Sequence, residues 1–181
     1  MGKLRVSFSL LDAWSRGDTQ LAIDTYFHVG GPKNKAMEYG IEFHDRIAKH
    51  IDKYNQFPDD FFSYPLMIPE AEKKVVANYN ELFDISAVFD CIDSPNLFEF
   101  KTGVQPATTW ARKDQLPLYF LVAELEGIPI EKAYLIHYNQ HSNEKDYVVV
   151  WNTPDKVERA RNIVDSYAPE IHSFFEREGL I

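Results

Sequence analysis

The stretch Val88-Phe89-Asp90-Cys91-Ile92-Asp93, followed after a short turn by Leu97-Phe98-Glu99-Phe100-Lys101-Thr102-Gly103, predicts two β-strands. Both segments are rich in β-branched and aromatic residues, which favour strands. On the second strand, Glu99 and Lys101 share one face, about 6.6 Å apart along the chain, while the alternating phenylalanines face the other side. The second strand therefore separates a polar face from a core face.

The short turn Ser94-Pro95-Asn96 folds the second strand back on the first, so Asp90 is expected to approach Glu99. Two adjacent carboxylates suit a hard cation, because Mg²⁺ binds one or two carboxylates and keeps several waters. Those waters leave room for a phosphate oxygen and an attacking hydroxide, and Lys101 would offset the negative charge that develops. The alternative is that Asp90, Asp93 and Glu99 are ordinary solvent-facing charges on a hairpin.

The segments on both sides of this hairpin show helical and strand patterns in turn. Apolar spacing predicts helices over 7–14, 19–26, 34–54, 110–126 and 153–178, and strands over 73–79, 82–92, 97–101, 133–138 and 146–151. The first three strands should form an antiparallel meander. Pro117 fits the fourth helix only in its first turn, which Asp114 as the N-cap would allow. This order of elements implies an α/β layered domain.

The bulk composition is that of one globular domain spanning residues 1–181. The hydrophobic share of 45% is typical of folded proteins, and no run approaches the roughly 20 apolar residues that span a bilayer. The first residues lack a basic segment followed by a long apolar run, so a secretory signal is not expected. These features predict a soluble, cytoplasmic protein with no membrane partner.

The formal net charge of −9 opposes nucleic-acid binding, because affinity for phosphates comes largely from Lys and Arg. A site that gathers carboxylates for a divalent metal is itself negative, however, and the bound cation reverses the local sign. The acidity therefore does not exclude DNA as a partner. Cys91 is the only cysteine, which excludes an iron–sulfur cluster held by four thiolates of this chain.

Two pairs of residues four apart lie on predicted helices, where that spacing places both members on one face. They are Gly40 with His44 and Gln115 with Tyr119. By itself the spacing is weak, because a single histidine on an amphipathic helix is more often a surface or core residue than a ligand. The order of these pairs around the acidic hairpin makes them informative.

Taken in this order, the motifs resemble those of the RecB-like branch of the PD-(D/E)XK nucleases, over roughly residues 7–122. The matching blocks are Ser7-Phe8-Ser9-Leu10-Leu11, Gly40-Ile41-Glu42-Phe43-His44, Phe89-Asp90-Cys91-Ile92-Asp93, Phe98-Glu99-Phe100-Lys101-Thr102-Gly103 and Gln115-Leu116-Pro117-Leu118-Tyr119. The resemblance implies a restriction-endonuclease-like mixed β-sheet core flanked by α-helices. It also implies hydrolysis of DNA phosphodiester bonds with Mg²⁺ or Mn²⁺.

The resemblance implies roles for the matched residues. It assigns metal binding to His44, Asp90, Glu99 and the carbonyl of Phe100, catalysis to Lys101 with Asp90 and Glu99, and orientation of the lysine or the DNA strand to Gln115 and Tyr119. An imidazole ligand favours Mn²⁺ somewhat over Mg²⁺. Independently, Trp110, Arg112 and Lys113 are candidates for stacking and phosphate contacts with a single strand, although an exposed basic helix start explains them equally well.

Three departures from the family pattern affect these expectations. Ala87 stands where members usually have Gly, which is a mild change. Some relatives carry four cysteines for an iron–sulfur cluster, which this chain lacks. Helicase motifs are absent, so a motor or DNA-loading partner would be another chain. Glu42, Glu72 and Glu81 could also face the site, but surface charge is the preferred interpretation of all three. Four histidines belong to no motif: His50, His137, His141 and His172.

Three functions remain open from the sequence. The first is a metal-dependent deoxyribonuclease, an exonuclease or an enzyme directed at single strands and ends, with a repair or recombination role only by analogy. The second is a non-catalytic module that binds or assembles on DNA ends and has kept the nuclease fold; retention of Asp90, Glu99 and Lys101 favours catalysis over it. The third is a metal-dependent hydrolase acting on RNA or a nucleotide.

Overall fold

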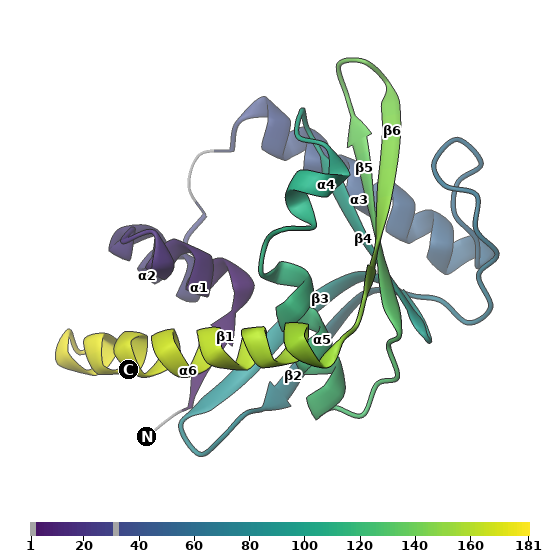
Figure 1. The fold of residues 1–181 in the computed structure, drawn as a ribbon. Helices are drawn as coiled ribbons and strands as arrows, with labels where there is room; N and C mark the ends of the chain where they lie inside the picture. The colour runs from purple at the N-terminus through teal and green to yellow at the C-terminus, as the bar shows by residue number, and fades with distance from the viewer. Residues whose placement is uncertain (1–2, 31–32) are drawn as a thin grey trace.

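The computed structural model describes residues 3–30 and 33–181, which form a mixed β-sheet flanked by helices (Figure 1). The strands are β1 (Leu4–Ser7), β2 (Glu70–Asn78), β3 (Phe83–Asp93), β4 (Asn96–Thr102), β5 (Lys132–Asn139) and β6 (Glu144–Trp151). The helices are α1 (Phe8–Ser15), α2 (Thr19–Tyr26), α3 (Lys35–Tyr54), α4 (Ala107–Trp110), α5 (Gln115–Leu125) and α6 (Pro154–Arg177). The predicted fold class is confirmed. Among these helices, none is long and apolar enough to cross a membrane.

β3 lies at the centre of the sheet and pairs along both of its edges. β2 runs antiparallel along one edge, from Asp84 to Ile92 of β3. The other edge is shared, because β1 is parallel to the first part of β3 and β4 is antiparallel to its last three residues. β4 and β5 are parallel, and β5 and β6 are antiparallel. The predicted meander of β2, β3 and β4 is confirmed, whereas the sequence pattern does not predict β1.

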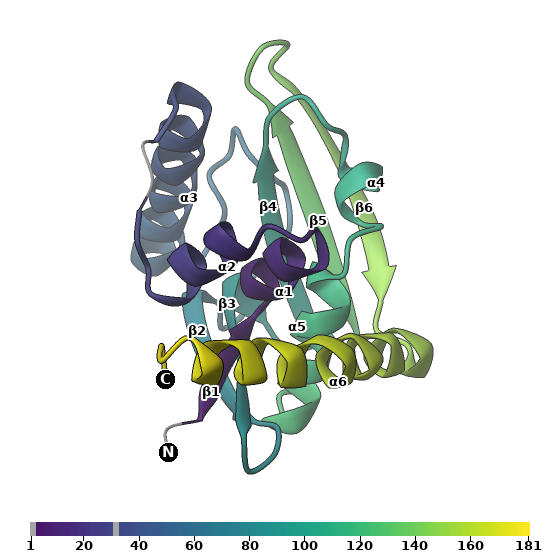
Figure 2. The same cartoon turned by 90° about the vertical axis from the view of Figure 1, so that its left-hand side faces the viewer.

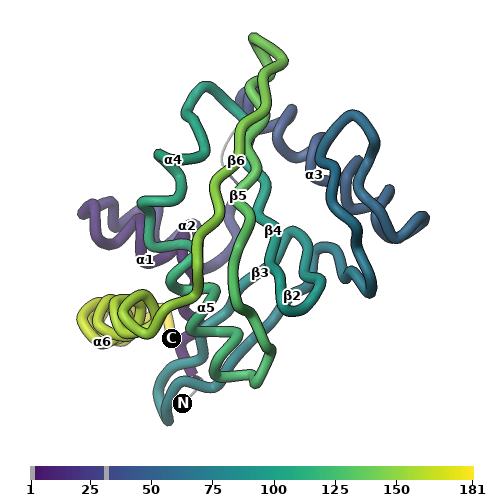
Figure 3. Tube along the Cα trace, turned by 45° about the vertical axis from the view of Figure 1, so that its right-hand side comes forward, coloured from purple at the N-terminus to yellow at the C-terminus, as the bar shows by residue number. Residues whose placement is uncertain are grey.

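Helices cover both faces of the sheet. α1, α5 and α6 lie together on one face, and α3 lies on the other (Figures 2 and 3). Because side chains alternate along β4, Leu97 packs in the larger core while Phe98 and Phe100 join an aromatic core with Phe43 of α3. The alternation is as predicted, but the polar face of β4 is not open to solvent, since Glu99 is only 2% exposed.

The predicted helix over 110–126 is wrong as a single element. The structure has the short α4 and then α5, separated by residues 111–114. Pro117 falls in the first turn of α5, where the missing N–H breaks no helical hydrogen bond. Asp114 occupies the N-cap position as predicted, but its side chain caps no amide of the described chain and instead pairs with Arg159 at 2.6 Å.

Candidate active site

Asp90 lies where one edge of β3 has no neighbouring strand. On that edge, β1 ends opposite Ser86 and β4 begins its pairing at Cys91, so 87–90 pair with no described strand there. The main-chain N–H of Phe100 donates a hydrogen bond of 2.6 Å to Oδ2 of Asp90. The Asp90 carboxylate therefore lies where β3 and β4 diverge and contacts the backbone of the residue after Glu99, which agrees with the predicted approach of Asp90 to Glu99.

Glu99 is a deeply buried carboxylate. Its Oε1 accepts hydrogen bonds from Nζ of Lys101 at 2.6 Å and from Nε2 of Gln115 at 2.7 Å. Its Oε2 is buried and has no hydrogen-bond partner in the part of the chain that the structure describes. Burial, and then the negative charge of Asp90, raises the pKa of Glu99 to about 7. An unpartnered buried oxygen costs free energy that a bound cation would relieve.

Lys101 keeps its positive charge in this site. Burial opposes the charged form, but the carboxylates of Glu99 and Asp90 outweigh burial and raise the pKa of Lys101. The ammonium also lies 5.4 Å from the centre of the Trp110 ring. Since a protonated lysine is a hydrogen-bond donor and not a base, Lys101 can stabilise negative charge but cannot remove a proton.

His44 and Glu72 complete a group of three ligand atoms with Asp90. Nδ1 of His44 lies 3.3 Å from Oδ1 of Asp90, and potential ligand atoms of all three residues lie within 4.8 Å of one another. Burial alone would lower the pKa of His44, but the hydrogen bond and charge of Asp90 raise it. Burial, and then Asp90, raises the pKa of Glu72. The group has excess negative charge, which favours a cation.

Of the two interpretations of Glu72, surface charge and a residue that faces the site, its placement favours the second. Glu72 is exposed, but it stands opposite Asp90 between the pairs that Ala71 and Lys73 make with β3. Its φ of 48° is unusual for a residue other than glycine. A rare backbone conformation of this kind often occurs at functional sites, and here it coincides with the group formed by Glu72, Asp90 and His44. The signal that could have found it is strand register, which composition does not reveal.

The donors present suit a divalent metal ion. Carboxylate oxygens are ligands for Mg²⁺ and Mn²⁺, and the imidazole of His44 adds a ligand that Mn²⁺ accepts more readily. The unpartnered Oε2 of Glu99 is a further carboxylate oxygen. The structure thus contains a possible carboxylate and histidine metal site, as the sequence predicts, with Glu72 added. The carbonyl of Phe100 as a ligand stays a prediction.

Gln115 and Tyr119 lie side by side on α5, as their spacing predicts. The Gln115 amide donates to Glu99 and, at 2.9 Å, to the hydroxyl of Tyr119. Burial raises the pKa of Tyr119, so its hydroxyl stays protonated at neutral pH. Gln115 and Lys101 therefore donate hydrogen bonds to the same oxygen, Oε1 of Glu99.

The three residues predicted to contact a DNA strand, Trp110, Arg112 and Lys113, differ in their distance from the site. Trp110 is part of the site, because the centre of its ring lies 5.4 Å from Nζ of Lys101 and 4.4 Å from Nζ of Lys113. Arg112 is exposed, and no hydrogen bond or ion pair of its side chain occurs within the described residues. The structure therefore joins Trp110 and Lys113 to the site and leaves Arg112 beside it.

Close packing at Gly40 brings α3 onto β4. A Cβ atom at Gly40 would lie 3.1 Å from Oγ1 of Thr102, a tighter contact than most side chains make. The absence of a side chain lets the helix approach and carry His44 to Asp90. This contact gives a physical reason for Gly at the start of the block that ends in His44.

Gly40→Ala is expected to destabilise the protein, and adding Thr102→Ala is expected to restore it. Alanine normally stabilises a helix relative to glycine by about 1 kcal/mol, so a loss would report the clash with Thr102. Chemical denaturation of both single variants and the double variant measures a coupling of about 1 kcal/mol. Additive effects of the two substitutions would contradict this account.

The raised pKa of Glu99 makes the metal-free protein lose stability as pH rises. The folded-state pKa of about 7 lies above the ordinary 4.5, so the folded state holds the proton more tightly. The loss of unfolding free energy is absent below pH 4.5, grows between pH 4.5 and 7, and reaches at most about 3 kcal/mol above that window.

Urea unfolding in EDTA measures this loss, and the unfolding free energy of Glu99→Gln should fall less across the window than that of the wild type. Glu124→Gln on the exposed surface is the control, and equal falls would show that Glu99 is not the cause.

Comparison with known proteins supports the fold. No protein-family model matches the sequence, and no curated protein matches it significantly. A putative exonuclease from Eubacterium rectale superposes with a TM-score of 0.67 at 10% identity, over 98% of this chain and 83% of that chain. An alkaline exonuclease (LHK-Exo) from Laribacter hongkongensis, also solved with dAMP, gives 0.57 at 13% identity, over 97% and 93%.

A phage-related exonuclease from Haemophilus somnus 129PT gives a TM-score of 0.58 at 11% identity, over 98% of this chain and 97% of that chain. Identities this low establish a shared architecture and no more. The chain therefore shares the fold of these three proteins, with the mixed sheet and flanking helices that the sequence predicts. Placement in the RecB-like branch stays a prediction.

Proposed function

We propose that the protein is a divalent-metal-dependent deoxyribonuclease that hydrolyses phosphodiester bonds at DNA ends or in single strands. The observation that carries the proposal is the buried Glu99 and Lys101 pair beside Asp90, His44 and Glu72. The exonuclease fold and the resemblance to RecB-like nucleases support it. We assign the activity to one domain over residues 1–181; a helicase partner, if used, would be a separate chain.

Metal binding would fall to Asp90, Glu72, His44 and the free oxygen of Glu99, with the carbonyl of Phe100 as a further ligand. The bound Mg²⁺ or Mn²⁺ would lower the pKa of a water and neutralise charge on the phosphate. The cation would also offset the charge of Asp90, which adds to burial in raising the pKa of Glu99.

The remaining polar residues of the site would orient and stabilise the reacting groups. Lys101 would donate a hydrogen bond to the attacking oxygen or to a phosphate oxygen as charge develops. Gln115, fixed by Tyr119, would keep Glu99 in place. Trp110 and Lys113 would meet the bases and phosphates of the strand, with Arg112 as an outer phosphate contact.

The proposal is tested with end-labelled single- and double-stranded DNA in Mg²⁺, Mn²⁺ or EDTA. Cleavage in one or both metals and none in EDTA is the expected result, and the label position then reports whether products arise from ends. Binding of DNA without cleavage in any metal would replace the proposal with a non-catalytic end-binding module. Cleavage of RNA alone would change the substrate class.

A further inference from the structure

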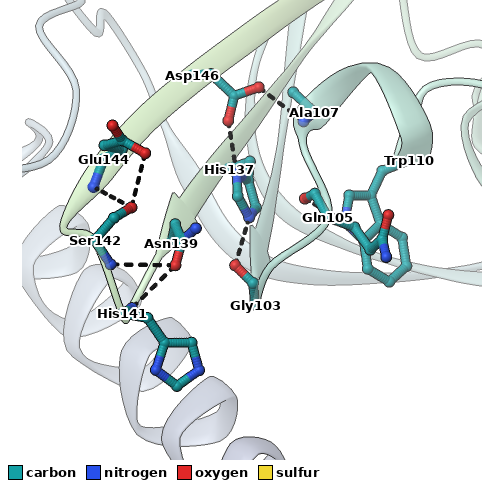
Figure 4. Close-up of polar contacts among 10 residues, drawn as sticks. All are labelled: Gly103, Gln105, Ala107, Trp110, His137, Asn139, His141, Ser142, Glu144 and Asp146. Carbon is teal, nitrogen blue, oxygen red and sulfur yellow. Dashed lines mark hydrogen bonds and ion pairs between the residues drawn. The ribbon is translucent and has the colours of Figure 1, made fainter.

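The hairpin of β5 and β6 contains a buried histidine that has no part in the chemistry assigned above. His137 is 3% exposed, and its two ring nitrogens face different acceptors (Figure 4). Nδ1 lies 2.6 Å from Oδ1 of Asp146, and Nε2 lies 2.8 Å from the carbonyl oxygen of Gly103. A neutral imidazole has one N–H, so it can donate to only one of these acceptors. Both contacts are short, so His137 is held between Asp146 of β6 and the residue that follows β4.

Asp146 uses its second oxygen to hold the same segment farther along the chain. Oδ2 accepts a hydrogen bond of 2.8 Å from the main-chain N–H of Ala107 (Figure 4). His137 and Asp146 thus hold both ends of the segment 103–107, one through a carbonyl and the other through an amide. Between these ends, the carbonyl of Gln105 accepts a hydrogen bond of 3.2 Å from the Trp110 indole.

This segment connects Lys101 to Trp110. His137 stands beside Lys101 in the register of β4 and β5. The segment starts two residues after Lys101, at Gly103 with a φ of 124° that favours glycine, and it leads into α4. α4 ends at Trp110, whose ring lies against the Lys101 ammonium. The distance between ring and ammonium therefore depends on how the segment is held.

We propose that His137 and Asp146 are a positioning pair that holds the segment 103–110, so that Trp110 stands beside Lys101 and meets the DNA strand. The inference rests on the proposed nuclease function. It assigns the pair no contact with the reacting atoms. A purely structural pair would change stability without selectively changing the affinity for DNA, which separates the two roles.

The test uses Asp146→Asn as the main variant, because the Asp146 side chain is 44% exposed and its replacement should leave the fold intact. His137→Gln and His137→Ala follow, with His141→Gln on the same hairpin as the matched control. KM for a single-stranded oligonucleotide is expected to rise about tenfold for Asp146→Asn, the scale of a lost hydrogen bond to a charged group, with kcat within about threefold. His137→Gln keeps a hydrogen-bond donor for the Gly103 carbonyl, so its KM should rise less than that of His137→Ala.

Binding of the same oligonucleotide in Ca²⁺, followed by fluorescence anisotropy, gives a readout that does not need cleavage. Weaker binding by Asp146→Asn and His137→Ala, with normal binding by His141→Gln, supports the positioning pair even if the wild type cleaves nothing. In that case the proposed cleavage fails and the inference about binding stands. Unchanged KM and unchanged binding in the variants would overturn the inference, as would a loss of kcat and thermal stability with KM unchanged.

Discussion

Lys101→Ala is expected to reduce metal-dependent DNA cleavage by about 100- to 1000-fold, the cost of losing one preorganised group that stabilises transition-state charge. The Lys101 side chain is 17% exposed and lies 2.6 Å from Glu99, so its position is fixed before substrate binds. The raised pKa keeps its ammonium charged across the neutral range. The loss should appear in kcat, measured with end-labelled DNA under saturating metal.

Two controls make this result specific. Lys101→Met keeps the bulk of the side chain without its charge and should be as inactive as Lys101→Ala. Lys53→Ala removes an exposed lysine at the end of α3 and should cleave like the wild type. Metal binding should survive in the Lys101 variants, because no ligand is removed. Cleavage within a few fold of the wild type in both Lys101 variants would exclude a catalytic role for the lysine.

Asp90→Asn is expected to abolish cleavage and to weaken Mn²⁺ binding by at least about 100-fold, because it removes a carboxylate ligand at the centre of the group. Asp90 contacts His44 and the Phe100 amide, and it lies within the ligand group that includes Glu72. Asparagine has nearly the same shape and can still accept the hydrogen bond from Phe100. Titration calorimetry with Mn²⁺ measures the loss directly.

The same substitution should leave the metal-free protein as stable as the wild type or more so. The charge of Asp90 contributes to the raised pKa of both Glu99 and Glu72, and removing it relieves that repulsion. Thermal unfolding in EDTA and in Mn²⁺ separates the effects, since the wild type should gain stability from the metal and Asp90→Asn should not. Asp84→Asn, on the same strand but away from the site, should behave like the wild type in both conditions. Normal Mn²⁺ stabilisation of Asp90→Asn would place the metal elsewhere.

The arrangement of β3 and β4 could be predicted because its causes are local. Alternation along β4 separates Glu99 from Phe98 and Phe100, and the turn between the strands is short. β1 could not be predicted in the same way. Its four residues pair with Phe83–Ser86, about eighty positions away, and only that long-range contact makes them a strand.

The site shows the same division between local and long-range information. The order of the blocks that contain His44, Asp90 and Lys101, and their resemblance to a known family, predict residues that the structure brings together. Glu72 and His137 gain their neighbours through strand register, which an isolated segment does not show. Pro117 and Asp114 do indicate the start of α5, but no signal in the sequence shows that the residues before it form the separate short helix α4.

β1 also bears on the tendency of the protein to aggregate. It covers the first part of one edge of β3, and Leu4 and Val6 are fully buried there. Without β1, the unpaired edge of β3 would extend from Phe83 to Asp90, and its free amides and carbonyls could pair with a strand of another molecule. Removal of residues 4–7 is therefore expected to promote edge-to-edge association of the protein, which light scattering would detect.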